Sequence, residues 1–162
     1  MRVLGVDPGT SVTGYGVIES GNGGLGGLGG LGRLVECGVI RFSAASPLPR
    51  RLHELYSQIA DLIARHRPGA LALENAFYHK NVHTTLVLGH ARGVILLAAE
   101  QAGIAVAEYP PATVKKTVVG AGGAPKAQVG TVVARLLRLK NAPKPADAAD
   151  GVAVALAHIL RS

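Results

Sequence analysis

The stretch VLGVDPGTSVTGYGV, residues 3–17, decides the fold, because it holds two strands and the turn that joins them. Residues 2–6 form a short apolar run of the kind found in buried strands, and the run ends at Asp7. Pro-Gly follows Asp7, and residues 12–19 then form a second, β-branched strand. Asp7 is therefore a turn former, a contact to phosphate, or a metal ligand at the end of a strand.

The rest of the chain predicts an α/β fold with a mixed five-stranded sheet flanked by helices. Residues 34–42 form a third strand after a hairpin, so the first three strands alternate in direction. The helix over 50–65 then leads to a strand at 70–74, and such a crossover returns the chain parallel to the first strand. A fifth strand at 104–109 follows a long helix at 84–103.

The helix at 84–103 is apolar on more than one side, which predicts that other elements or a partner cover it. Shorter helices are expected at 112–118 and 127–139, with a glycine-rich loop between them. The last helix is predicted from Asp147 to Leu160, with a buried stripe that runs from Ala149 to its end. All 162 residues are expected to form one domain.

A glycine tract, GNGGLGGLGGLG, separates the second and third strands at residues 21–32. Its eight glycines predict a flexible hairpin tip. Its first residues also match the dinucleotide-binding pattern GxGxxG, which requires a helix directly after it. We predict a strand there instead, so composition alone accounts for the match.

Charge and composition narrow the class of protein. The formal net charge is +7, and residues 109–162 hold 8 basic but only 2 acidic side chains. A basic surface favours a polyanionic partner such as nucleic acid, although a solvated basic face explains it too. No long apolar run or leader-like N-terminus is seen, and Cys37 has no cysteine to pair with. We therefore expect a soluble, cytoplasmic protein without membrane contact.

The acidic residues of the predicted strand ends and of the last helix form the candidate site. Asp7 and Glu74 end parallel strands, where α/β sheets bind ligands, and Asp147 and Asp150 share one helix face. Carboxylates about 4 Å apart repel by roughly 4 kcal/mol per pair at an effective dielectric constant near 20, so cations must compensate them. Two Mg²⁺ ions would do so and would clamp a phosphodiester for hydrolysis. The alternative roles are a turn for Asp7 and interaction with the helix dipole for Asp147 and Asp150.

Five motifs resemble a known family: VDPGTSVTGYGVIE, LENAFYHKN, GHARGVI, VKKTVVGAGGAPKAQV and PADAADGVAVALAH. In this order and spacing they are similar to the RuvC family of crossover junction endodeoxyribonucleases, the bacterial Holliday junction resolvases. The resemblance runs from Val3 to about His158, and only the glycine tract departs from it. It implies a ribonuclease H-like fold and Mg²⁺-dependent, paired symmetric cleavage of a four-way DNA junction that leaves 5′-phosphate and 3′-hydroxyl ends.

The resemblance also implies roles for individual residues. Asp7, Glu74, Asp147 and Asp150 match the acidic quartet that holds two Mg²⁺ ions, with Mn²⁺ as a substitute. The implied DNA contacts are Phe77, Tyr78, Lys80, Lys115, Lys116 and Lys126, of which Phe77 matches an aromatic residue that stacks on unpaired bases. The implied partners are a second copy of the chain, through the helix around Gly89 to Gly93, and a branch-migration helicase complex.

Three other functions stay open on the sequence. The DxGT turn also resembles the phosphate-binding hairpin of actin-like ATPases and sugar kinases, which close two such domains over ATP. A related nuclease family acts on ribosomal RNA precursors and shares the aspartate at the strand end. A basic module that binds junctions without cutting them would have the same charge distribution.

Overall fold

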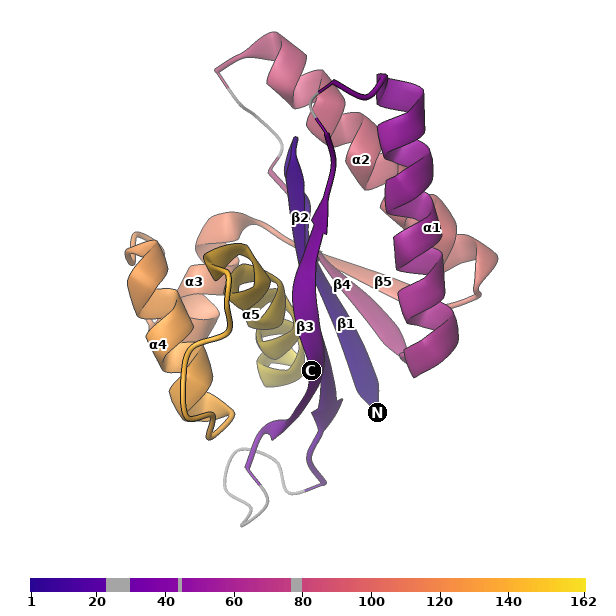
Figure 1. Cartoon of the computed structure of the whole chain (residues 1–162). Coiled ribbons are helices and arrows are strands. Elements are labelled where there is room, and N and C mark those ends of the chain that lie inside the picture. Colours follow the sequence, from indigo (N-terminus) through magenta and orange to yellow (C-terminus); the bar gives the residue numbers. More distant parts are fainter. Residues whose placement is uncertain (23–29, 44, 77–79) are drawn as a thin grey trace.

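The sheet has the predicted mixed topology. The computed structural model describes residues 1–22, 30–43, 45–76 and 80–162 (Figure 1). Its strands are β1 (Arg2–Asp7), β2 (Val12–Ser20), β3 (Gly32–Arg41), β4 (Ala70–Glu74) and β5 (Ala105–Tyr109). They lie in the order β3-β2-β1-β4-β5, antiparallel from β3 to β1 and parallel from β1 to β5. The strands and their directions are confirmed, with β3 beginning two residues earlier than predicted.

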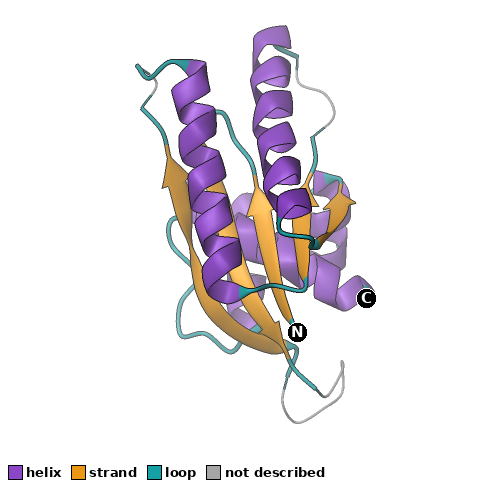
Figure 2. Cartoon of the chain, turned by 90° about the vertical axis from the view of Figure 1, so that its right-hand side faces the viewer, coloured by secondary structure: helices purple, strands orange, loops and turns teal. Residues whose placement is uncertain are grey.

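Helices cover both faces of the sheet, as Figures 1 and 2 show. They are α1 (Leu48–His66), α2 (Val82–Gln101), α3 (Pro111–Val119), α4 (Lys126–Leu136) and α5 (Ala146–Arg161). One core cluster joins α1 and α2 to the sheet through residues such as Leu4, Ile59 and Ile95. The other joins α5, α3 and α4 to the opposite face. The side chains of each strand therefore alternate between two apolar layers, which explains the nearly continuous apolar runs in β1 and β4.

The local chemistry of two helix ends explains where the predicted bounds were wrong. Helix α2 begins at Val82 because the side chain of Asn81 accepts a hydrogen bond from the Thr84 amide at 3.2 Å. Helix α4 ends at Leu136, three residues before the predicted end. Arg138, two residues on, has a left-handed backbone with φ of 55° that a helix cannot contain.

Helix α5 is buried on nearly all sides, whereas the sequence predicted a single buried stripe. Every residue from Ala148 to Ala157 except Asp150 is buried, and the two predicted stripe positions at the end, Ile159 and Leu160, are only half-buried. The reason is tertiary: the sheet covers one side of α5, and α3 and α4 cover the other (Figure 1).

The close approach of α5 to the sheet depends on glycine. A Cβ atom on Gly14 of β2 would lie 1.8 Å from the carbonyl oxygen of Asp147, and one on Gly5 of β1 would lie 2.3 Å from that of Gly151. A Cβ atom on Gly151 would in turn lie 2.4 Å from the backbone of Tyr15. Backbone therefore packs on backbone, and the start of α5 is fixed against β1 and β2.

Helix α2 is long and apolar enough, by length and composition alone, to cross a membrane, although the sequence predicted no membrane span. Its residues Ala91, Ile95 and Ala98 are nevertheless buried in the core cluster with α1 and the sheet. A core helix with a second apolar face accounts for the same composition.

Two sequence expectations fall partly or wholly on residues outside the described ranges. The glycine tract is described only at its ends, residues 21–22 and 30–32, so the expected flexible tip stays a prediction. Strand β3 begins directly at Gly32, and no helix follows the tract. The dinucleotide-binding pattern therefore lacks the helix N-terminus that it requires.

The Gly14→Ala variant should lose stability, because its new methyl group would meet the backbone of Asp147, which cannot rotate away. We expect a loss of about 1–3 kcal/mol in the free energy of unfolding, measured by urea denaturation. The control is Gly123→Ala, where an added Cβ meets nothing within 4 Å and the change should stay within about 0.5 kcal/mol. Equal stability of both variants would contradict the close packing of α5.

Candidate active site

The carboxyl edge of the sheet brings Asp7 and Glu74 together. Each ends its strand, and β1 and β4 are parallel neighbours in which Val6 pairs with Leu73. Because side chains alternate along a strand, both carboxyl groups point to the face that carries α5. The two carboxyl groups lie within hydrogen-bonding reach of each other, and this contact favours the protonated form of Asp7. The turn-former role alone does not explain this contact.

The start of α5 supplies the other two acids. Asp147 and Asp150 lie in its first two turns, beside the point where the helix backbone packs on Gly14. The Asp150 side chain is only 16 % exposed, against 40 % for Asp147, so Asp150 is the more buried of the two. The negative charge of Asp150 acts on both Asp7 and Glu74 and raises the pKa of each. All four acids thus belong to one electrostatic cluster.

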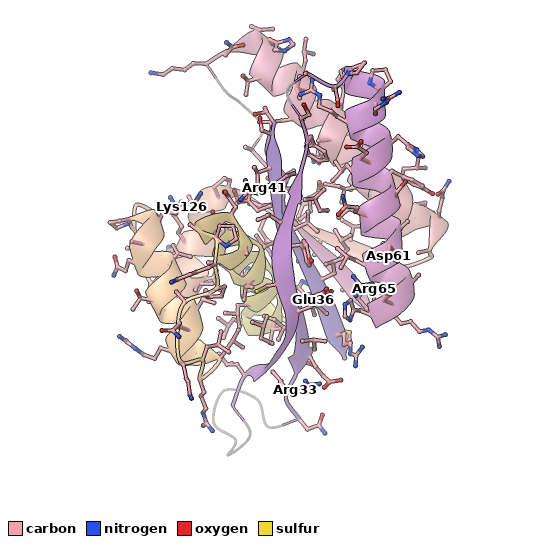
Figure 3. All side chains as sticks on the ribbon, viewed as in Figure 1. Arg33, Glu36, Arg41, Asp61, Arg65 and Lys126 are labelled. Atoms are coloured by element: carbon pink, nitrogen blue, oxygen red, sulfur yellow. The ribbon has the colours of Figure 1, made fainter. Side chains whose placement is uncertain are left out.

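Lys126 closes this acidic cluster from the side of α4. Its ammonium lies 3.0 Å from Oδ1 of Asp147 and 3.0 Å from Oδ2 of Asp150. Figure 3 shows Lys126 at the beginning of α4, level with the N-terminal end of α5. The sequence placed this lysine near a DNA phosphate; the structure places it on two of the acids.

The pKa values in the cluster show how costly its negative charge is. Burial is the main cause that raises the pKa of Asp7 to about 8, and the charges of Glu74 and Asp150 raise it further. Burial likewise raises the pKa of Glu74 and of Asp150, while Lys126 opposes the rise at both. The two carboxylates in turn raise the pKa of Lys126 far above its ordinary value. Such shifts are typical of sites that bind cations or transfer protons.

The other predicted DNA contacts lie at different distances from the acids. Lys115 of α3 is close enough for its charge to lower the pKa of Glu74 and of Asp150. Lys116, the next residue, lines a hollow with Arg161 at the far end of α5 instead. Lys80 is exposed just before α2. Phe77 and Tyr78 lie outside the described residues.

A second hollow, of about 150 Å³, lies on the other side of Glu74, toward α2. Pro8 and Leu88 line it together with Arg92, whose Nε donates to Oε1 of Glu108 at 2.7 Å. The sequence analysis did not identify Arg92. The sequence did hold a sign of its role. Arg92 is the one lysine or arginine in a mainly apolar helix, where a charge needs a partner.

The donor chemistry of the cluster fits a divalent cation. Four carboxylates offer the oxygen donors that Mg²⁺ prefers, and the ammonium of Lys126 compensates part of their charge in this structure. Within the described ranges, no three acidic, histidine or cysteine side chains are arranged as a ready-made metal site. The residues therefore fit a cation by type and place, with side chains that must turn toward it.

A mixed sheet of this topology with acids at its carboxyl edge defines a nuclease of ribonuclease H-like fold. Residues 3–158 match the family described as crossover junction endodeoxyribonuclease RuvC. The RuvC protein of Halorhodospira halophila is 47 % identical over 157 residues, which cover 97 % of this chain and 89 % of the relative. The chain therefore belongs to the RuvC family. The family consists of endonucleases, which are hydrolases, and its members depend on metal ions.

Solved structures agree with this assignment. The Thermus thermophilus RuvC structure superimposes with a TM-score of 0.87 at 34 % identity, covering 99 % of this chain and 94 % of that one. A second structure, T. thermophilus RuvC in complex with Holliday junction substrate, gives a TM-score of 0.85 at 30 % identity with the same coverage. Both confirm the ribonuclease H-like fold expected from the sequence. Family membership also sets aside the ATPase and sugar kinase alternatives.

The raised pKa of Asp7 predicts how the stability of the protein in chelator depends on pH. Between about pH 4 and pH 8 the folded state keeps a proton that the unfolded state releases, so stability falls as pH rises across this window. Asp7→Asn removes the titration and should make the protein more stable than the wild type at pH 8. The gain should shrink toward pH 5, by at most about 1.4 kcal/mol per pH unit. Urea unfolding in EDTA measures it, and a gain that is independent of pH would contradict the raised pKa.

Proposed function

We propose that this protein resolves Holliday junctions in DNA recombination and repair, by paired symmetric cleavage that leaves 5′-phosphate and 3′-hydroxyl ends. The observation that carries the proposal is the cluster of four carboxylates at one edge of the sheet, with raised pKa values at Asp7, Glu74 and Asp150. Membership in the RuvC family supports the substrate, as does the junction complex of the T. thermophilus relative.

Each acid has a defined part in this proposal. Asp7, Glu74, Asp147 and Asp150 are the ligands for two Mg²⁺ ions, which Mn²⁺ can replace. The metal ions, when bound, activate the attacking water and stabilise the leaving oxygen. Asp7 must release its proton to act as a ligand, and its pKa of about 8 means that a cation has to drive this release near neutral pH.

Basic residues around the cluster suit the path of a DNA strand. Lys115 lies within electrostatic range of Glu74 and Asp150, so a phosphate held at the acids would also meet its ammonium. The surplus of basic residues after position 108 lies in the elements that follow β5, among them α3 and α4. Lys80, Lys116 and Lys126 are further proposed DNA contacts, on the ground of family membership. The stacking of Phe77, with Tyr78 beside it, on unpaired bases stays a prediction.

A homodimer is the proposed form of the enzyme, because two symmetric cuts need two active sites. The apolar residues Val82, Leu86 and Leu97 of α2 are 74 %, 58 % and 51 % exposed, respectively. They share one helix face with Gly89 and Gly93, where an added Cβ would meet nothing within 4 Å. An exposed apolar face with small residues suits the close approach of a second α2 helix.

Two further parts of the proposal rest on family membership. A branch-migration helicase complex is the proposed partner of the dimer on the junction. The cytoplasm is the proposed location, since the bacterial chromosome is the substrate. Neither part changes the chemistry assigned to the site.

Incubation with a synthetic four-way junction and Mg²⁺ tests the function. We expect paired nicks at symmetric positions, and the loss of cleavage in Asp150→Asn with junction affinity largely kept, because the change removes a metal ligand but no DNA contact. Linear duplex and a ribosomal RNA precursor serve as alternative substrates. Binding without nicks would favour the non-catalytic module, and cleavage of the RNA precursor alone would favour the related nuclease family.

The variant Leu86→Glu tests the proposed dimer. A charge on the exposed face of α2 should raise the dimer dissociation constant at least about tenfold, measured by sedimentation equilibrium, because two carboxylates would be buried across the interface. The matched control is His53→Glu on the exposed side of α1, which should not change the association. A monomeric wild type, or equal association of both variants, would contradict this interface.

A further inference from the structure

Lys126 is the strongest feature that the proposed function leaves unexplained. Its ammonium bridges Asp147 and Asp150 at 3.0 Å each, and its charge also acts on Asp7 and Glu74. A DNA contact would direct the ammonium outward to a phosphate. Here it lies between one oxygen of Asp147 and one of Asp150, the two acids of α5 that the proposed function assigns to the cations.

The position of Lys126 in α4 strengthens this point. It is the first residue of the helix after Pro125, where the positive end of the helix dipole disfavours a lysine. The carboxylates of Asp147 and Asp150 compensate for this placement. Helix α4 is also fixed against α5, since a Cβ on Gly130 would lie 3.8 Å from that of Ala149. The backbone of Lys126 therefore keeps a set distance from both acids.

We propose that Lys126 is a positioning residue that occupies the cation site between Asp147 and Asp150, and that a divalent cation must displace its ammonium to bind there. The proposal rests on the proposed metal-dependent function and goes further, because it makes cation binding a competition within the chain. One carboxylate oxygen cannot hold both an ammonium hydrogen bond and a metal ion in the same direction.

The side chains allow the exchange. Lys126 is 54 % exposed, so its flexible stem can swing the ammonium outward without disturbing the core. Asp150 is only 16 % exposed and is held by the packed backbone of α5. The lysine therefore leaves while the acids stay, and the displaced ammonium becomes available to a phosphate at the site. Until then its positive charge offsets part of the repulsion among the carboxylates.

Mn²⁺ binding to the full-length protein tests the competition without any cleavage assay. Electron paramagnetic resonance measures free Mn²⁺ in titrations of the wild type, Lys126→Met and Lys115→Met. Lys115→Met is the matched control, because it removes one charge near the same acids without removing an ion pair to them. We expect Lys126→Met to bind Mn²⁺ on the order of tenfold more tightly, and Lys115→Met to change by less than about threefold.

The outcomes separate this inference from the proposed function. Unchanged or weaker binding in Lys126→Met would overturn the inference, and so would equal tightening in Lys115→Met, since general charge would then explain the effect. No Mn²⁺ binding in any variant would instead overturn the proposed metal site. The Asp150→Asn variant should bind weakly under either outcome and so identifies the site being measured.

A measurement on the wild type covers the case in which Lys126→Met does not fold. Reaction with acetic anhydride, followed by mass spectrometry, reports how accessible each lysine is. Acetylation of Lys126 should rise severalfold when Mg²⁺ is added, while that of the exposed Lys140 stays constant. Protection of Lys126 that does not change with Mg²⁺ would contradict the displacement.

Discussion

The contact between the backbone of α5 and the glycines of β1 and β2 is the constraint on which the site depends. Glycine at positions 5, 14 and 16 removes the side chains that would otherwise hold the helix farther from the sheet. The helix can therefore lie close enough for the acids of its first turns to act on the acids of two strand ends. A chain with larger residues at these positions could keep the same topology and still have no acidic cluster.

The charge balance of the site follows from this geometry. Burial raises the pKa of three of the acids, and mutual repulsion adds to the effect at Asp7 and Glu74. Two effects offset this negative charge: protonation of Asp7, which its raised pKa favours, and the ammonium of Lys126 on the other pair. Both are reversible, which is what a site needs if it is to exchange its compensating charge for metal ions.

Much of this arrangement could be predicted from the sequence, because it follows from strand direction. An apolar run that ends in an acid places that acid at a sheet edge, and the crossover rule makes β1 and β4 parallel, so Asp7 and Glu74 had to meet. The bridge from Lys126 could not be predicted, since it depends on how α4 packs against α5. The burial of α5 was missed for a related reason: its many alanines give a weak pattern, and the covering helices are separate elements. Arg92 was not predicted as a site residue, because the interpretation of its helix rested on the apolar residues alone.

The order of the acids along the chain has a consequence for biosynthesis. Asp7 and Glu74 emerge from the ribosome early, but Asp147 and Asp150 belong to the last helix of the described chain. A nascent polypeptide that has completed the sheet still lacks two of the four acids of the cluster. The glycine-lined face of the sheet is then not yet covered by α5. The helix that completes the core therefore also completes the proposed metal site.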